Sequence, residues 1–251
     1  MAASEPSIDA LSQFRLSTVF GSVGQSVNFT QSNLMMLIGG ILTVGLLWWG
    51  MRPRAVVPGR MQALAEMSYQ SVMSMTVGTI GEEGRRFFHF IFTLFFFVLM
   101  GNLLGIIPYA FTYTSHIAVT AALAVLVIIL VTLVALRIHG LRFFTYFVPQ
   151  GAPKMLMPII VPIEIISYLS RPVSLSIRLF ANMVAGHVLF EVFAAFTVML
   201  GTMGVIGWVP AGAAIAVNVA LVAFEYLVAF LQAYVFAILT CIYLHDAVHL
   251  H

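Results

Sequence analysis

Charge is scarce in this sequence of 251 residues. Asp, Glu, Lys and Arg make up 8% of the chain, whereas hydrophobic residues make up 61%. A typical soluble domain carries about 25% charged residues. None of the four charged types occurs from Phe87 to Leu136. This composition excludes an ordinary soluble domain, and the net charge of +2 is too small to favour nucleic acid as a partner.

Cysteine and several other signals are also missing. The chain has one cysteine, Cys241, which excludes an internal disulfide. The first thirty residues are polar and show no basic segment leading into an apolar one, so no signal peptide is expected. Short alternating segments typical of a membrane β-barrel are not visible. The remaining class is a polytopic α-helical membrane protein.

Long apolar runs predict how this all-α polytopic membrane protein is built. We expect an exposed leader over residues 1–33 and a single membrane domain over residues 34–251. The expected helices cover residues 34–51, 61–80, 88–107, 116–137, 161–200 and 211–244. The first is a transmembrane helix, the second an amphipathic helix at the membrane surface, and the next two a transmembrane hairpin. Gly101 and Gly105 have the small-residue spacing that lets helices approach closely.

The last two helices are too long to stand upright in a bilayer. At about 1.5 Å per residue, each is roughly 50–60 Å long, whereas the hydrocarbon core is about 30 Å thick. Residues 201–210 are expected to form the turn between them. We therefore predict a long, steeply tilted C-terminal hairpin whose shape suits wrapping around a large neighbour.

Basic residues predict the orientation of the chain. Eight of its eleven Lys and Arg residues fall beside expected membrane ends on one side: Arg52, Arg54, Arg60, Arg85, Arg86, Arg137, Arg142 and Lys154. An excess of Lys and Arg marks the cytoplasmic side. The amino terminus is then expected outside, in the periplasm, and the carboxyl terminus in the cytoplasm.

Arg178 is the most informative single residue. It lies in the apolar stretch VSLSIRLFANMVAGH, and its guanidinium cannot lose its proton at any useful pH. Holding such a charge at membrane depth costs roughly 2.5–3.5 kcal/mol on insertion scales. Intramembrane charges usually serve ion or proton movement, so we predict that role for Arg178.

Further polar residues form one stripe along each long helix. The members recur every seven residues or lie one turn from Arg178, so each set shares a broad face. The first stripe contains Glu164, Arg171, Ser174, Arg178 and Asn182, and the second contains Asn218, Glu225 and Gln232.

A hairpin folded near residues 205–206 predicts which of these residues face each other. It sets Arg178 level with Gln232 and His187 level with Glu225. Histidine titrates near neutrality, so a His–Glu pair in a low dielectric can exchange a proton. Nine residues separate Arg178 from His187, which places them about 180° apart on an ideal helix. Either the helix is distorted or, as we favour, Arg178 faces a partner and His187 a water-filled path.

Structural roles for these residues remain open. Arg171 could extend its charge to the interface, Glu164 could be an interfacial carboxylate, and Glu191 could be solvated. The amides of Asn182, Asn218 and Gln232 could serve as hydrogen bonds between helices. His245 and His249 have the i, i+4 spacing of metal ligands, but a solvated terminus is the expected state of HDAVHLH. We predict no metal and no cofactor.

Three segments resemble one known family. SRPVSLSIRLFANMVAGH (170–187), TLFFFVLMGNLLGIIPY (93–109) and LQAYVFAILTCIYL (231–244) are similar to subunit a of the F-type ATP synthase, the stator proton-channel subunit. The likeness covers nearly all of the chain after about residue 34. In the pair His187 and Glu225 the histidine comes first in the chain, and this order resembles that of alphaproteobacterial and mitochondrial members.

The resemblance implies roles for the polar residues. Arg178 matches the essential arginine that faces a carboxylate of the rotating ring of c subunits. Asn182 and Gln232 match polar residues beside it, and His187 and Glu225 match a pair in the outer half-channel. The positions toward the inner half-channel are Glu164, Arg171 and Ser174. The resemblance also implies peripheral-stalk b-type partners and a subunit without catalysis of its own, since no nucleotide-binding signature is present.

Two other classes remain as alternatives. A stand-alone proton-coupled transporter would often show internal repeats and broken midplane helices, and we find neither. A purely structural membrane subunit would tolerate substitution of Arg178.

Overall fold

The computed structural model describes residues 30–50, 52, 58–107, 111–148 and 156–249. Within these ranges the chain forms six α-helices and no strand. The helices are α1 (Gln31–Gly50), α2 (Arg60–Ile80), α3 (Phe88–Ile106), α4 (Ile117–His139), α5 (Met157–Gly201) and α6 (Val205–Val248). Three short 3₁₀ segments, η2 (Glu82–Arg86), η3 (Tyr113–Ser115) and η4 (Gly140–Phe147), connect them. The predicted all-α architecture is confirmed.

Five of these helices are long and apolar enough to cross a membrane. They are α1, α3, α4, α5 and the part of α6 from Gly207 to Val248. α2 is not among them; it buries Ala65, Val72 and Ile80 while its intervening polar residues are mostly exposed. The placement of α2 at the membrane surface stays a prediction. Most of the predicted leader, and Lys154, lie outside the described residues.

The protein core lies between α3, α4, α5 and α6. Its fully buried members include Ile91 and Val98 on α3, Leu179 on α5 and Phe236 on α6. These helices are apolar almost all round, as expected for membrane spans, so only close packing distinguishes the inner face from the outer one. α1 contributes little to this core, because most of its surface is exposed.

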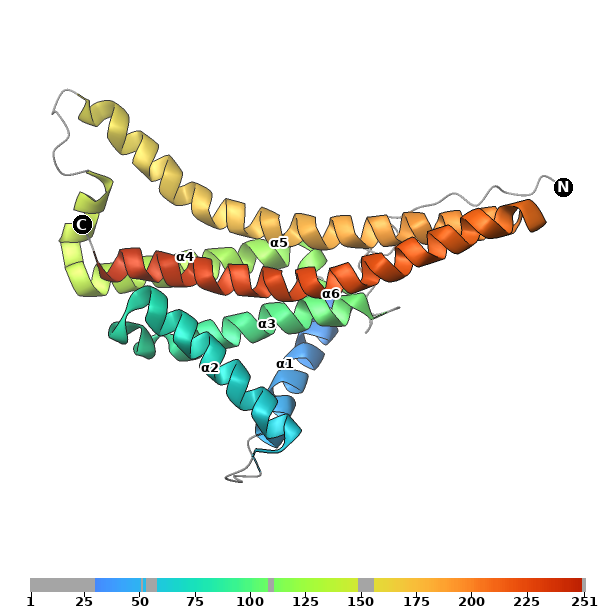
Figure 1. Cartoon of the computed structure of the whole chain (residues 1–251). Coiled ribbons are helices and arrows are strands. Elements are labelled where there is room, and N and C mark those ends of the chain that lie inside the picture. Colours follow the sequence, from blue (N-terminus) through green and yellow to red (C-terminus); the bar gives the residue numbers. More distant parts are fainter. Residues whose placement is uncertain (1–29, 51, 53–57, 108–110, 149–155, 250–251) are drawn as a thin grey trace, which may run out of the picture.

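The two longest helices form an antiparallel hairpin that extends beyond the rest of the molecule (Figure 1). α5 has 45 residues and α6 has 44, so each is roughly 65 Å long, more than twice the hydrocarbon thickness. α5 continues through Pro162 and Pro172 and curves away from α6 toward its start. Prolines remove a backbone hydrogen bond and are the usual cause of such bends.

The hairpin turn is shorter than the sequence suggests. We expected a turn over residues 201–210, but α5 ends at Gly201 and α6 begins at Val205, with Pro210 inside it. Gly204 has a φ of 74°, which glycine adopts without strain. A Cβ at Gly207 would collide with the carbonyl oxygen of Leu200. The glycines therefore make a tight turn rather than a loop.

The spacing of Gly101 and Gly105 serves a different purpose from the predicted one. A Cβ at Gly101 would lie 2.5 Å from the ring of Tyr113, and one at Gly105 would collide with the side chain of Thr112. Tyr113 also donates a hydrogen bond of 2.6 Å to the carbonyl of Phe97. The two glycines thus admit the α3–α4 connector into the side of α3, instead of a second helix.

Candidate functional site

Arg178 lies on an exposed face of α5. The neighbouring face of the same helix is buried at Leu175, Leu179 and Met183, which are spaced four residues apart. Ser174 and Arg178 are both exposed, as their spacing of one turn predicts. Among the residues that the structure describes, Arg178 has neither a hydrogen bond nor an ion pair. Its charge is therefore available to a group outside this chain.

His187 and Glu225 lie together inside the hairpin, as predicted from the register. His187 Nε2 is 3.9 Å from Glu225 Oε1, and the two side chains are only 13% and 10% exposed. Gly186 makes room for the carboxylate, because a Cβ there would lie 3.0 Å from Glu225 Oε1. Since α5 is continuous from Arg178 to His187, the half-turn between them is preserved, and Arg178 points outward while His187 points inward.

The α3–α4 connector adds a residue that the sequence did not reveal. Thr112 Oγ1 lies 3.0 Å from His187 Nε2, the same nitrogen that faces Glu225. Beside it, Asn102 is fully buried, donates to the carbonyl of Ala229 and accepts from Thr114 Oγ1 at 2.9 Å. Two of these contacts, Thr112 with His187 and Asn102 with Ala229, join residues 75 and 127 positions apart, so no local spacing predicts them.

The other predicted cross-hairpin pair is wrong by one turn. Gln232 accepts a hydrogen bond from Asn182 Nδ2 at 3.4 Å, rather than facing Arg178. The two helices curve, so the register that brings His187 to Glu225 does not continue unchanged to Gln232. Gln232 is buried and its Nε2 has no hydrogen-bond partner within the described residues.

The remaining predicted site residues occupy two regions. Asn218 lies near the hairpin turn, in an open groove lined also by Phe190 and Thr197, and its buried Oδ1 has no hydrogen-bond partner in the described structure. Glu164 lies near the start of α5, where this helix diverges from α6, and is half-buried. The two residues are thus near opposite ends of the hairpin, with Arg178 between them.

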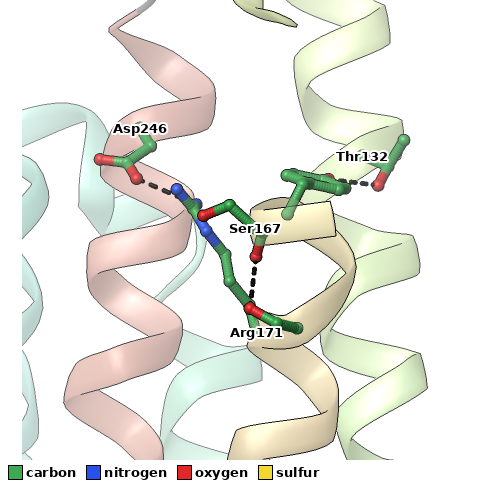
Figure 2. A network of polar contacts seen from close by, with 6 residues as sticks. Thr132, Ser167, Arg171 and Asp246 are labelled. Carbon is green, nitrogen blue, oxygen red and sulfur yellow. Dashed lines mark hydrogen bonds and ion pairs between the residues drawn. The ribbon is translucent and has the colours of Figure 1, made fainter. Parts of the chain in front are cut away.

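Arg171 forms an ion pair in the part of the hairpin that lies away from the α5–α6 turn (Figure 2). Its Nη1 donates to Asp246 Oδ2 at 3.1 Å, and the two side chains are 21% and 34% exposed. The guanidinium also lies 5.6 Å and 5.2 Å from the ring centroids of Tyr168 and Tyr243. The expected solvated tail is therefore wrong at Asp246, because α6 continues to Val248 and carries this carboxylate to Arg171.

Two more contacts close the same end of the molecule. Tyr168 on α5 and Thr132 on α4 share a hydrogen bond of 2.7 Å between their hydroxyls. His139 Nε2, at the end of α4, lies 3.2 Å from the carbonyl oxygens of Ala247 and Val248. Every pair among α4, α5 and α6 is thus joined by a polar contact here.

The α3–α4 connector carries two groups whose titration is perturbed by burial. Burial raises the pKa of Tyr113, so its hydroxyl remains protonated under ordinary conditions. Burial lowers the pKa of His116, which stacks on Phe111 at 5.1 Å and has a buried Nε2 without a hydrogen-bond partner in the described structure. His116 also precedes the first turn of α4, where a positive charge is unfavourable. The described residues include no cluster of three or more His, Cys, Asp or Glu side chains able to hold a metal.

The fold and the site together define an all-α polytopic membrane protein with buried polar groups inside a long hairpin and an unpaired arginine on its outer face. A family model described as ATP synthase A chain matches residues 33–245. The chain belongs to this family, the proton-translocating stator part of F-type ATP synthase.

Individual relatives agree over the whole chain. It is similar to ATP synthase subunit a of Granulibacter bethesdensis, with 68% identity over 99% of this chain and 100% of the relative. The protein of the same description from Gluconacetobacter diazotrophicus is 59% identical over 98% of this chain and 99% of the relative. The protein of the same description from Rhodospirillum rubrum is 50% identical over 91% of this chain and 92% of the relative. The resemblance to alphaproteobacterial members is confirmed.

Proposed function

We propose that this chain conducts protons through two offset half-channels that each reach only the middle of the membrane. The half-channels deliver protons to, and collect them from, carboxylates of a rotating ring of c subunits. Arg178 separates them. The chain itself catalyses no bond chemistry; a peripheral stalk of b-type subunits holds it in place, and ATP is made elsewhere in the complex.

The observation that carries this proposal is the unpaired charge of Arg178. The hairpin compensates its other arginine with Asp246 and places His187 beside Glu225. Arg178 alone among the charges discussed here is exposed on α5 without a partner in the described chain. An unpaired charge in a bilayer is costly, so a carboxylate of another subunit is the expected counter-ion.

The outer path runs past Asn218, Glu225 and His187. These residues lie between the hairpin turn and the level of Arg178, and each has a polar side chain that is at least half-buried. A proton passes from Glu225 to His187 or the reverse, because the carboxylate and the imidazole are held 3.9 Å apart. Thr112, on the same imidazole nitrogen, orients the ring.

The inner path runs past Glu164 and Ser174, both of which precede Arg178 on α5. Glu164 lies near the start of the helix, where α5 diverges from α6, and Ser174 lies one turn before Arg178. Asn182, one turn from Arg178, is held by its hydrogen bond to the buried Gln232 and helps to position the ring carboxylate. Arg171 is left out of the proton path, because a guanidinium cannot release its proton and this one is compensated by Asp246.

Arg178 has two tasks in this mechanism. Its charge favours the ionised form of an arriving carboxylate, which then gives its proton to the inner path. The same charge repels a proton that would otherwise pass directly between the half-channels. Each charge that crosses 100 mV yields about 2.3 kcal/mol, which the ring converts into rotation.

Substitution of Arg178 tests the proposal. In inverted membrane vesicles containing the complete synthase, Arg178→Ala should abolish ATP-driven proton pumping. Arg178→Lys should leak or stall, because an amine can lose its proton in a dry site. Glu82→Gln, in an exposed ion pair with Arg85, is the control and should pump normally. Normal pumping by an assembled Arg178→Ala enzyme would rule the proposal out, and the purely structural role would then stand.

A further inference from the structure

Arg171 and Arg178 are seven residues apart on one continuous helix. Seven residues are nearly two turns, so an ideal helix would place both arginines on one face, about 10.5 Å apart along the axis. Their surroundings differ, however. Arg178 is exposed and unpaired within the described chain, whereas Arg171 turns toward α6 and pairs with Asp246 (Figure 2).

The surroundings of Arg171 hold it away from the exposed face. Its guanidinium lies near the rings of Tyr168 and Tyr243, and Tyr168 is itself fixed to α4 through Thr132. A cavity of about 10 Å³ beside the ion pair has room for about one water molecule. The end of α6 that carries Asp246 is also fixed in place, because His139 of α4 contacts the backbone carbonyl oxygens of Ala247 and Val248.

We propose that Asp246 is a positioning residue that cancels the charge of Arg171, so that an arriving ring carboxylate meets only the charge of Arg178. This inference rests on the proposed function. A ring carboxylate must be ionised beside Arg178 and must regain a proton before it re-enters lipid. A second uncompensated cation would hold it in the ionised form and delay that step.

The size of the effect follows from Coulomb's law. The axial rise between Arg171 and Arg178 sets the shortest separation, about 10.5 Å, for a ring carboxylate at the level of Arg178. At that distance and an effective dielectric of about 20, an uncompensated unit charge favours ionisation of the carboxylate by at most roughly tenfold. Salt screens this interaction little in a buried setting. The ion pair removes most of it, because the charge of Asp246 lies 3.1 Å from that of Arg171.

Neutralising variants separate this role from simple bracing of the hairpin. Asp246→Asn removes the carboxylate that faces Arg171 and should slow ATP-driven pumping by up to roughly tenfold. Adding Arg171→Gln removes the cation itself and should restore pumping. Asp246→Glu keeps the pair and should pump normally. A brace between α5 and α6 predicts instead that the double variant stays as slow as Asp246→Asn, because both have lost the ion pair.

The measurements are made in inverted vesicles with the whole synthase, and the amount of assembled complex is determined for each variant. Rates are compared per assembled complex, so that destabilisation by loss of the ion pair is separated from an effect on the ring carboxylate. An assembled double variant that remains as slow as Asp246→Asn overturns it. So does normal pumping by Asp246→Asn.

Arg178→Ala in the same preparation distinguishes a failure of the role of Asp246 from a failure of the proposed function. If Arg178→Ala abolishes pumping while Asp246→Asn pumps normally, only the role of Asp246 fails. If Arg178→Ala pumps normally, the proposed function fails, and the role of Asp246 fails with it. Glu82→Gln, which breaks the exposed ion pair with Arg85, controls for the loss of an acidic residue as such.

Discussion

At the scale of single residues, the charged side chains of the hairpin have three kinds of surroundings. Arg171 is compensated by a carboxylate, Glu225 is buried beside a histidine, and Arg178 is left without a partner in the described chain. A charge without a counter-ion is costly in a bilayer, so under the proposed function the partner subunit approaches the face of Arg178. The spacing of seven residues predicted the shared face of Arg171 and Arg178, but not their different surroundings.

In the proposed mechanism, the outer path depends most directly on Glu225. We expect Glu225→Leu to slow passive proton flux through vesicles stripped of the catalytic sector by at least about tenfold, because a proton-carrying group is lost from a desolvated site. Glu225→Asp should retain much of the flux. Flux in Glu225→Leu equal to that of the unaltered protein would remove this residue from the path.

His116 should make the stability of the protein depend on pH. Burial lowers its pKa, so the unfolded chain binds this proton more tightly than the folded one does. The stability contributed by the neutral ring is present above the ordinary histidine pKa and is lost as the pH falls below it. We expect His116→Gln to lose less thermal stability in detergent between about pH 8 and about pH 5. An equal loss in both proteins would contradict this.

At the scale of elements, the α3–α4 connector matters as much as the helices. Thr112 and Tyr113 enter α3 at two glycines and bring a hydroxyl to His187. The spacing of Gly101 and Gly105 was recognisable in the sequence, but its partner was not. A glycine pair reports only that something approaches the backbone closely, and the same pattern serves a helix or a loop.

Gly105→Ala tests how closely this connector packs against α3. The added Cβ collides with Thr112, so we expect a loss of about 1–3 kcal/mol in stability, measured as a lower unfolding temperature in detergent. Gly40→Ala on α1 is the matched control, because a Cβ there has no neighbour within 4 Å. If the two variants were equally stable, the connector would not be held as the structure has it.

At the scale of the whole molecule, the helix ends that carry basic residues lie away from the α5–α6 turn. The end of α4, η2 and the end of α6 gather at one end of the molecule, the α5–α6 turn lies at the other, and the junction of α1 and α2 lies apart from both (Figure 1). Arg85, Arg86 and Arg137 belong to the first group and Arg52 and Arg60 to the α1–α2 junction, so the basic residues still predict a cytoplasmic side away from the turn. The turn should then face the periplasm.

Labelling of single cysteines tests this orientation. Met203→Cys in the hairpin turn should react with a membrane-impermeant maleimide in intact cells, because Met203 is 65% exposed. His249→Cys should react only after the cytoplasmic side is opened. The native Cys241 is fully buried and should contribute little background. The reverse pattern of labelling would invert the assigned topology.

The sequence by itself determined the class, the helices and the residues of the hairpin that carry charge. Composition and helical spacing are local properties, so they identified Arg178, His187 and Glu225 and the pairing of the last two. Only the tertiary structure decided that Asn182 faces Gln232, that Thr112 reaches His187 and that Asp246 compensates Arg171. These contacts depend on how curved helices and connectors pack across the molecule, and a shift of one turn exchanges one partner for another.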